Sequence, residues 1–546
     1  MPWNQAYDPA GHWLVSTLLA ALPVFVLLGT LAFLKLKAHW AASLGLLSAL
    51  LVALAVFAMP AGKGAAVAVY GAAYGLFPIG WIILNVIFLY SLAEEKGYFT
   101  ILRESLAGVT RDRRLQLLLI AFSFGAFFEG AAGFGTPVAV SAAILIGLGF
   151  SPLLASGLSL IANTAPVAFG ALGTPLIALA GVTGLDLRAL SAMVGRQLPA
   201  FSIIIPFWLV WVYAGWRGMA GVWPALLVAG VSFAVPQFLL ATFHGPWLAG
   251  VGAAVVSIGA LLAFLRVWTP RTIWLGGRGE TWDAAAASTP PAGGGAAGLR
   301  ARAQVIRAWV PWLVLSGLVF LWGIPAIKNL LDGVSLLKIR VPGVDRLIYR
   351  VPPVVPGPAP EAAVFSLNGL SATGSGIFLA ALVSAAVMGY SLREMARVWW
   401  KTLKRVRFSL FTVSAMMAIG FVSRYAGLDA TMGLAFARTG VLYPFFGTML
   451  GWLGVALTGS DTSSNVLFGS LQKITAGQLG LSPTLMAAAN SSGGVMGKMI
   501  DAQSIVVAST ATKWYGQEGR ILRFVFFHSL ALAGLMGLLV MLEAYL

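Results

Sequence analysis

The 546-residue sequence predicts an all-α polytopic membrane protein, and three features of its composition lead to that fold class. Hydrophobic residues make up 59% of the chain and charged residues only 10%, against about a quarter in an average soluble domain. A soluble fold with so few polar residues could not cover an apolar interior. Several apolar runs are long enough to cross a bilayer, which takes about 20 residues per helix. The composition therefore excludes a cytosolic enzyme, a disordered scaffold and a secreted disulfide-bonded protein.

The apolar segments predict about 12–14 transmembrane helices, with re-entrant or broken helices among them. Segments near 128–136, 153–175 and 459–510 are too short, or too rich in Gly and Pro, to be plain spans. The apolar segments lie near 14–34, 42–58, 65–93, 115–128, 132–149, 153–182, 198–215, 221–242, 246–266, 308–326, 365–390, 408–426, 439–458, 463–475, 483–497, 503–512 and 522–545.

Lys and Arg gather in a few stretches between these segments, and such loops are typically cytoplasmic. The stretches are Lys35 with Lys37, 94–114, 266–307 and 393–407. The nearly uncharged N-terminus is then expected outside the cytoplasm. The net charge of +17 has the same explanation, so we expect no nucleic-acid partner.

A low-complexity segment rich in Ala, Gly, Pro and Ser, at 281–298, divides the chain into two halves. The expected regions are an N-terminal transmembrane half at 1–267, a flexible cytoplasmic linker at 268–305 and a C-terminal transmembrane half at 306–546. A Pro-rich segment at 327–364 holds charges of both signs. We expect it as an extracytoplasmic loop with a small β-hairpin around 336–351.

The two halves contain similar stretches in the same order, which predicts an internal repeat. The matched stretches are 133–136 with 459–462, 148–152 with 479–483, and 163–164 with 490–491. Loop charges give the two repeat cores, 115–183 and 427–510, opposite directions through the membrane. Two inverted repeats with broken helices are typical of secondary transporters, which hold substrate near the bilayer midplane. The alternative is chance similarity between helices rich in small residues.

Tracts of Gly, Pro and small polar residues predict four helix breaks, at 130–137, 163–166, 457–465 and 490–494. Free N–H groups at helix N-termini attract anions, and non-helical backbone at membrane depth lies only where protein or a cavity covers it. We expect these tracts to form a pocket for a small carboxylate. The alternative is close helix packing, which also favours small residues. The candidate substrate-binding residues are Gly133, Gly135, Thr136, Asn163, Thr164, Ser460, Thr462, Ser463, Ser464, Asn490, Ser491, Ser492 and Lys498.

Ionisable residues within these tracts are few, and each is a functional candidate because charge inside a membrane is expensive. Glu129 is a candidate proton carrier, and its alternative role is a helix cap or an ion pair. Asp461 either carries the proton or caps a helix that begins at Thr462. Lys498 either offsets the charge of the substrate or pairs with Asp501 three residues along a helix.

Two long motifs make the chain similar to the bacterial lactate permease family, which includes glycolate permease. They are 125–173 (GAFFEGAAGFGTPVAVSAAILIGLGFSPLLASGLSLIANTAPVAFGALG) and 451–504 (GWLGVALTGSDTSSNVLFGSLQKITAGQLGLSPTLMAAANSSGGVMGKMIDAQS). The resemblance covers nearly the whole chain. It implies uptake of L-lactate, D-lactate and glycolate with protons, by a multi-pass protein of a bacterial inner membrane.

The chain departs from the family pattern at two places. Asp501-Ala502-Gln503 stands where the family has Ser-Pro-Gln, so Asp501 becomes a third candidate for proton coupling. Arg424 stands where a small polar residue is expected, and is either a gate or a charge at the membrane boundary.

The resulting hypothesis is a carrier whose breaks at 133–136 and 460–464 face each other around the substrate carboxylate. Its expected partners are a lactate or glycolate anion, protons and the lipid bilayer. Because the chain has no Cys and no H-E-x-x-H or G-x-S-x-G motif, we expect no metal, no other cofactor and no enzyme activity. A sodium-coupled carboxylate carrier is the near alternative, and a channel or an intramembrane enzyme is a distant one.

Overall fold

The structure is a computed structural model that describes residues 2–32, 34, 36–98, 100–101, 109–131, 133, 136–275, 302–515 and 517–546. Within that part of the chain, 11 helices are long and apolar enough to cross a membrane. The number rises to 12 if a pair of helices bent by 64°, Pro152–Ala162 and Val167–Thr183, forms one span. The helical, many-spanning fold class is confirmed, and the inverted relation of the repeats stays a prediction. The predicted linker core at 281–298 lies outside the described residues.

Some helix boundaries of the first half coincide with caps that the sequence supplies. Asp186 accepts a hydrogen bond from the backbone N–H of Ala189 at the start of α11, and Gly184 ends α10 with a left-handed conformation, at φ 68°. The elements are α1 (Trp13–Ala32), α2 (Ala38–Ala55), α3 (Ala61–Tyr74), η1 (Gly75–Gly80), α4 (Trp81–Glu95), α6 (Arg113–Leu117), η2 (Leu118–Phe124), α7 (Gly125–Ala131), α8 (Thr136–Gly147), α9 (Pro152–Ala162), η3 (Val167–Phe169), α10 (Gly170–Thr183), α11 (Leu187–Ala220), α12 (Trp223–Leu239), η4 (Leu240–His244) and α13 (Pro246–Val267).

In the second half, the basic stretch 393–407 is not a loop but the first part of a long helix, α17. Ser391 and Glu394 form a capping box that starts this helix before its apolar part. The elements are α14 (Arg302–Gly323), α15 (Pro325–Ser335), α16 (Thr373–Val387), α17 (Leu392–Ala426), α18 (Leu428–Phe436), η6 (Ala437–Leu442), α19 (Tyr443–Thr458), α20 (Asp461–Gln478), α21 (Pro483–Gly497), α22 (Ala502–Ala511) and α23 (Glu518–Tyr545).

Among the residues that the structure describes, five short strands form two small sheets: β1 (Trp3–Asn4), β2 (Leu336–Arg340), β3 (Ile348–Arg350), β4 (Ala359–Pro360) and β5 (Val364–Asn368). The prediction of a hairpin around 336–351 is wrong, because β2 and β3 lie in different sheets. β2 pairs antiparallel with β5, whereas β3 lies between β1 and β4. Instead, β3 pairs in parallel with β1 near the N-terminus. A local turn pattern cannot predict a pairing between strands so far apart in the sequence.

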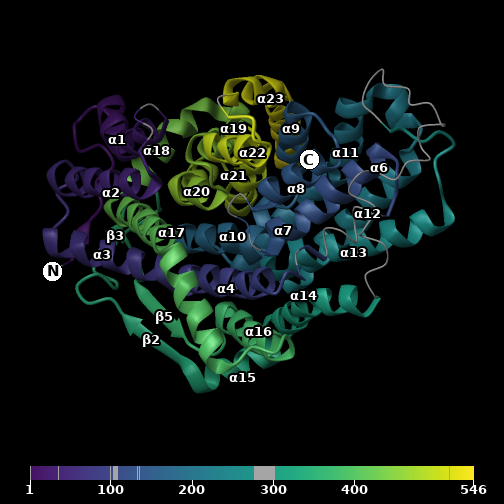
Figure 1. Ribbon diagram of the computed structural model, residues 1–546. Helices are drawn as coiled ribbons and strands as arrows, with labels where there is room; N and C mark the ends of the chain where they lie inside the picture. The colour runs from purple at the N-terminus through teal and green to yellow at the C-terminus, as the bar shows by residue number, and fades with distance from the viewer. Residues whose placement is uncertain are drawn as a thin grey trace.

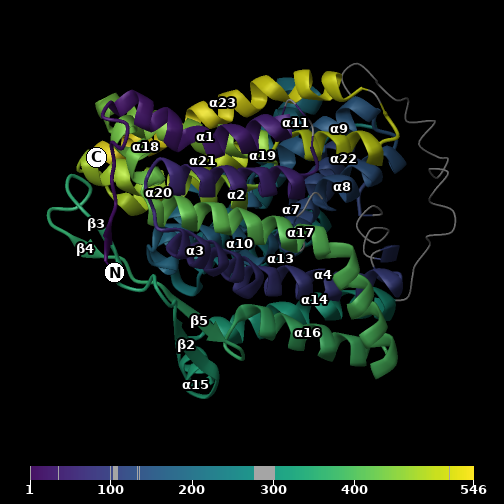
Figure 2. The same ribbon diagram turned by 90° about the vertical axis from the view of Figure 1, so that its left-hand side faces the viewer.

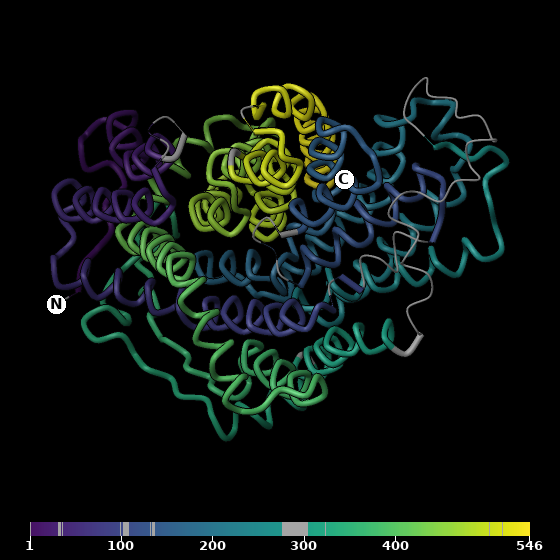
Figure 3. Tube along the Cα trace, in the orientation of Figure 1, coloured from purple at the N-terminus to yellow at the C-terminus, as the bar shows by residue number. Residues whose placement is uncertain are grey.

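The helices from the two motifs lie side by side although they are far apart in the sequence. Figure 1 shows α19–α22, in olive and yellow, next to α7–α10 in blue, and α10 contacts α20 directly. The tube in Figure 3 shows the purple N-terminal helices on one flank, next to the green segment that contains α17. In Figure 2 most helices run across the view, and the strands and both termini lie at the same end of the bundle. This end is called the strand end below.

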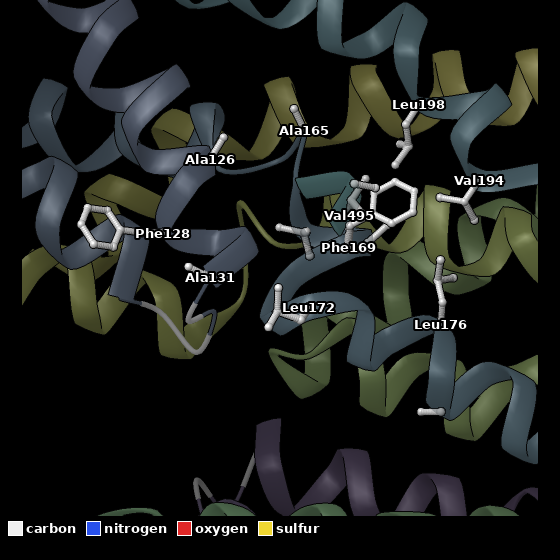
Figure 4. Packing of buried hydrophobic residues seen from close by; sticks show 14 of the residues in the cluster. Ala126, Phe128, Ala131, Ala165, Phe169, Leu172, Leu176, Val194, Leu198 and Val495 are labelled. Atoms are coloured by element: carbon white, nitrogen blue, oxygen red, sulfur yellow. The ribbon is translucent and has the colours of Figure 1, made fainter. Parts of the chain in front are cut away.

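The interior joins the two halves through a continuous cluster of buried hydrophobic side chains. Phe128 on α7, Phe169 before α10, Leu176 on α10, Leu198 on α11 and Val495 on α21 belong to it (Figure 4). Lipid tails are as apolar as these side chains, so close packing and dispersion hold membrane helices together more than removal from water does. Tight packing of small and large residues therefore fixes where the helix breaks meet.

Candidate functional site

A cavity of about 280 Å³ lies where the broken helices converge. Its wall includes the junctions of α7 with α8, α19 with α20 and α21 with α22, together with the start of α10 and the middle of α17. The lining residues that the sequence predicted are Glu129, Gly133, Ser460, Asp461, Thr462, Ser463 and Lys498. Residues from both long motifs thus surround one space.

Glu129 lies in the last turn of α7, with its carboxyl between the first two breaks, and is 4% exposed. Two glycines make room for that carboxyl. A Cβ at Gly170 would lie 2.6 Å from Glu129 Oε1, and a Cβ at Gly133 would lie 3.6 Å from the same atom. Gly133 also has a left-handed backbone, at φ 61°. Asn163, the residue that ends α9, is buried, and neither polar atom of its side chain has a hydrogen-bond partner among the described residues.

Ser460 caps the N-terminus of α20, since its Oγ accepts a hydrogen bond of 3.3 Å from the backbone N–H of Ser463. Asp461 is the first residue of α20 and not its cap, so the prediction that it caps a helix starting at Thr462 is wrong. Gly459 turns the chain between α19 and α20 at φ 74°. Because Ser460, Thr462 and Ser463 line the cavity, the N-terminal turn of α20 faces it.

The Asp461 carboxylate is held on one side only. Its Oδ2 accepts hydrogen bonds from Ser491 Oγ at 2.5 Å and from Asn465 Nδ2 at 3.4 Å. Its Oδ1 has no hydrogen-bond partner among the described residues. A Cβ at Gly494 would lie 2.5 Å from this oxygen, so glycine is needed there to admit the carboxyl.

Lys498 pairs with Asp501, one of the two roles that the sequence left open for it. The Lys498 Nζ to Asp501 Oδ2 distance is 3.1 Å, and Nζ also donates to the Gly459 carbonyl at 2.6 Å. Asp501 in turn caps α22 by accepting from the Ser504 N–H at 2.7 Å. Lys498 still lines the cavity, whereas Asp501 is fully buried behind it.

The predicted break at 490–494 is wrong, because α21 runs without interruption to Gly497 and the break follows at 498–501. Gly493 and Gly494 do not interrupt the helix; they let it pack closely. A Cβ at Gly493 would lie 2.3 Å from the Thr448 carbonyl oxygen of α19. The other three predicted breaks coincide with helix ends in the structure.

Several predicted ligands lie behind the cavity wall and hold helices together. Asn490 Nδ2 donates to Asn465 Oδ1 at 2.9 Å, and Ser464 Oγ donates to the Gly451 carbonyl at 3.1 Å. The Thr164 hydroxyl bonds to a carbonyl of its own helix turn. The residues that are buried and do not line the cavity are Asn163, Thr164, Ser464, Asn490, Ser491, Ser492 and Asp501.

Two predicted ligands have no described side chain. Gly135 lies outside the described residues, and Thr136 is described only as the backbone of the first residue of α8. A direct contact of any predicted ligand with substrate stays a prediction.

Sequence reasoning missed part of the cavity wall: Gly170, Thr174, Pro175, Thr412 and Gln503. Ahead of Thr174, the residues Ala171, Leu172 and Gly173 all have positive φ, at 42°, 57° and 81°. Such a conformation is rare for Ala and Leu, and the packing around it, not local preference, maintains it. Only Gly173 in this segment carries a sequence signal.

A cluster of charges holds the far end of α10, at the strand end of the bundle. Arg424 Nη1 donates to the carbonyls of Gly181 and Val182 at 3.1 and 3.2 Å, and Nη2 bonds to Glu361 at 3.0 Å. Lys473 Nζ donates to the Thr183 carbonyl at 2.7 Å. Cations favour helix C-termini, so this cluster ties α10 to α17, α20 and the strand region. Arg424 is therefore part of a contact between helices, and both roles expected from the sequence, a gate or a charge at the membrane boundary, stay predictions.

Comparisons with known proteins place the sequence in a family. A family model described as L-lactate permease matches residues 16–546. The chain is 45% identical over 549 residues to the glycolate permease GlcA of Escherichia coli K12, covering 100% of this chain and 98% of that protein. It is 45% identical to the L-lactate permease of the same strain over 550 residues, and 44% identical to that of Bacillus subtilis 168 over 558 residues, again with 100% and 98% coverage.

Proposed function

The chain belongs to the L-lactate permease family, and from that premise we propose that it takes up L-lactate and related 2-hydroxy-monocarboxylates by proton symport. It is a multi-pass membrane transporter and not an enzyme. D-lactate and glycolate are the other proposed substrates, since a relative is named for glycolate. The observation that carries the proposal is the cavity, which collects hydroxyls, a helix N-terminus, a lysine and two carboxyls.

The N-terminus of α20 supports binding of the substrate carboxylate. This helix has 18 residues, and such a helix carries about half a positive charge at its N-terminus, with N–H groups directed outward. Ser460, Thr462 and Ser463 add hydroxyls at the same place. Lys498, which pairs with Asp501, adds a positive charge to the cavity wall.

Glu129 and Asp461 are the proposed proton carriers. Both line the cavity, and no ion pair within 4.0 Å among the described residues includes either of them. A buried carboxylate without a cation is expensive, so a carboxyl in this position is suited to bind a proton. One proton per anion makes transport electroneutral, which removes the opposition of about 2.3 kcal/mol per 100 mV that an inside-negative potential sets against an anion.

We place the transporter in the bacterial inner membrane with its N-terminus outside the cytoplasm, because the Lys- and Arg-rich stretches then face the cytoplasm. The strand end is then extracytoplasmic. Alternating access follows if the repeat cores, 115–183 and 427–510, move against the remaining helices.

The test is uptake of labelled L-lactate by liposomes that contain the purified protein. An acid-outside pH gradient is compared with a Na⁺ gradient, and unlabelled D-lactate and glycolate are the competitors. Protein-free liposomes are essential because lactic acid itself crosses lipid. We expect protein-dependent uptake driven by pH alone. A requirement for Na⁺ would overturn proton symport and leave the family assignment intact.

Two substitutions locate the proton carrier, and a third is their control. Glu129→Gln and Asp461→Asn each remove a titratable group from the cavity, and we expect at least one of them to lose pH-driven uptake. Asp429→Asn is the matched control, since Asp429 is 2% exposed, close to the 3% of Asp461, but does not line the cavity. Full pH-driven uptake by both cavity variants would refute their role.

A further inference from the structure

Buried amide side chains form a hydrogen-bonded chain that leads to Asp461 through the α19, α20 and α21 interface. Tyr443 OH donates to Gln472 Oε1 at 2.6 Å, and Gln472 Nε2 donates to Asn490 Oδ1 at 3.2 Å. Asn490 Nδ2 donates to Asn465 Oδ1 at 2.9 Å, and Asn465 Nδ2 donates to Asp461 Oδ2 at 3.4 Å. The four residues before Asp461 are fully buried. Every donor in the chain points towards the carboxylate.

Asn465 is the last amide of the chain and the one that joins two elements of the cavity. Its Nδ2 donates to Asp461 Oδ2 and also to the Pro175 carbonyl of α10, at 3.2 Å. Its Oδ1 is occupied by Asn490, so the amide cannot flip without losing a partner. Asn465 therefore links a candidate proton carrier on α20 to the helix across the cavity wall.

Pro175 lies at a position where a change in its hydrogen bond to Asn465 would affect the cavity. It lines the cavity and directly follows the left-handed segment 171–173 that starts α10. The opposite end of α10 is held by Arg424 and Lys473. A contact at Pro175 thus acts on the end of α10 that borders the cavity, opposite the end that the charged residues hold.

We propose that Asn465 is a positioning residue that couples the proton on Asp461 to the hold of α20 on α10. This inference rests on the proposed function. The two N–H groups of the Asn465 amide serve the two acceptors, and while Asp461 is ionised its Oδ2 draws the amide towards α20, because hydrogen bonds to charged groups are stronger than neutral ones. A proton on Asp461 weakens that pull, so the amide can move towards the Pro175 carbonyl and shorten its bond of 3.2 Å to it. Proton binding then favours the state in which Asn465 of α20 is hydrogen-bonded to Pro175 of α10. A proton can shift a conformational equilibrium only if the two states differ in such a contact.

The test compares two transport modes of one variant in the same liposomes. Asn465→Leu keeps the size of the side chain and removes both donated bonds. We expect exchange of labelled for unlabelled lactate, with no pH gradient, to stay close to the wild-type rate. Accumulation driven by a pH gradient should fall about tenfold, the effect of losing one hydrogen bond to a charged group. A role in packing alone would lower both modes together.

Gln472→Leu is the matched control, because it removes an equally buried amide from the same chain and leaves Asn465, Asp461 and Pro175 in contact. It should keep the wild-type ratio of accumulation to exchange. Asn465→Ser serves if the leucine variant does not fold, since one hydroxyl can donate to only one of the two acceptors, and it should also lower the ratio. An unchanged ratio in the Asn465 variants overturns this inference, whereas a wild-type protein without pH-driven uptake overturns the proposed function instead.

Discussion

Replacing Gly170 with alanine tests whether the Glu129 carboxyl must lie between the first two helix breaks. Gly170 has φ −60° and ψ 152°, a conformation that any residue adopts, so backbone strain plays no part. The obstacle is the carboxyl itself, because the new Cβ would lie 2.6 Å from Glu129 Oε1. Alanine at this position therefore perturbs Glu129 and little else.

The size of the effect follows from that distance. Non-bonded heavy atoms are best separated by about 3.5 Å, so the carboxyl must move by roughly 0.9 Å. Displacements of about 1 Å at a reacting group can lower rates by about 100-fold. Because the carboxyl is the mobile end of a side chain beside a cavity, it can move without unpacking the helices. We expect the free energy of unfolding to change by less than about 1 kcal/mol, below the usual overpacking range.

The assay is pH-driven lactate uptake by Gly170→Ala, with thermal unfolding measured on the same preparation. Gly477→Ala is the control, since a Cβ at Gly477 of α20 meets nothing within 4 Å. In the background of Glu129→Gln, the alanine should add much less than it does alone, because both changes act on one group. Wild-type uptake by Gly170→Ala, or a fully additive loss in the double variant, would refute the reasoning.

Two further predictions concern the charged groups. Glu361 is mostly buried, which by itself raises the pKa of its carboxyl, but Arg424 and Arg350 outweigh burial and hold the pKa below its usual value. The stability from this group is therefore complete above the ordinary glutamate pKa of about 4.3 and is lost as pH falls through the lowered pKa of the folded state; thermal unfolding from pH 7 to 3 should show this loss, and Glu361→Gln should reduce it. Lys498→Met leaves the buried Asp501 without its cation and should destabilise the fold by about 3–5 kcal/mol. Adding Asp501→Asn should restore much of the thermal stability without restoring uptake, and a double variant that transports normally would show that Lys498 has no part in anion binding.

The helix breaks show how well local sequence predicts where a helix ends. The tracts at 130–137, 163–166 and 457–465 contain Gly or Pro next to polar residues, and helices end there in the structure. The tract at 490–494 has a similar composition but stays helical, because its glycines contact α19 and Asp461. The sequence alone does not distinguish a glycine that ends a helix from a glycine that allows a neighbouring helix to pack closely.

The sequence predicts which types of residue form the candidate site, but only some of the individual residues that it predicts line the cavity. Glu129, Asp461 and Lys498 stand out because ionisable groups within apolar segments are rare, and all three line the cavity. Asn490 and Ser491 stand out equally, yet they lie behind the wall and bond to Asn465 and Asp461. Polarity marks both kinds of residue, and only the packing of α20 against α21 separates them.

Composition and the length of the apolar segments alone determined that this chain crosses a membrane many times, and the two long motifs determined its family. The number of crossings depends on the free-energy cost of placing side chains and backbone in lipid. That cost is nearly the same wherever the helices lie relative to one another. Tertiary structure alone decided which polar groups face the cavity, where the left-handed start of α10 lies and which strand pairs with β3. Such choices depend on contacts between segments far apart in the sequence, and local preference is weaker than those contacts.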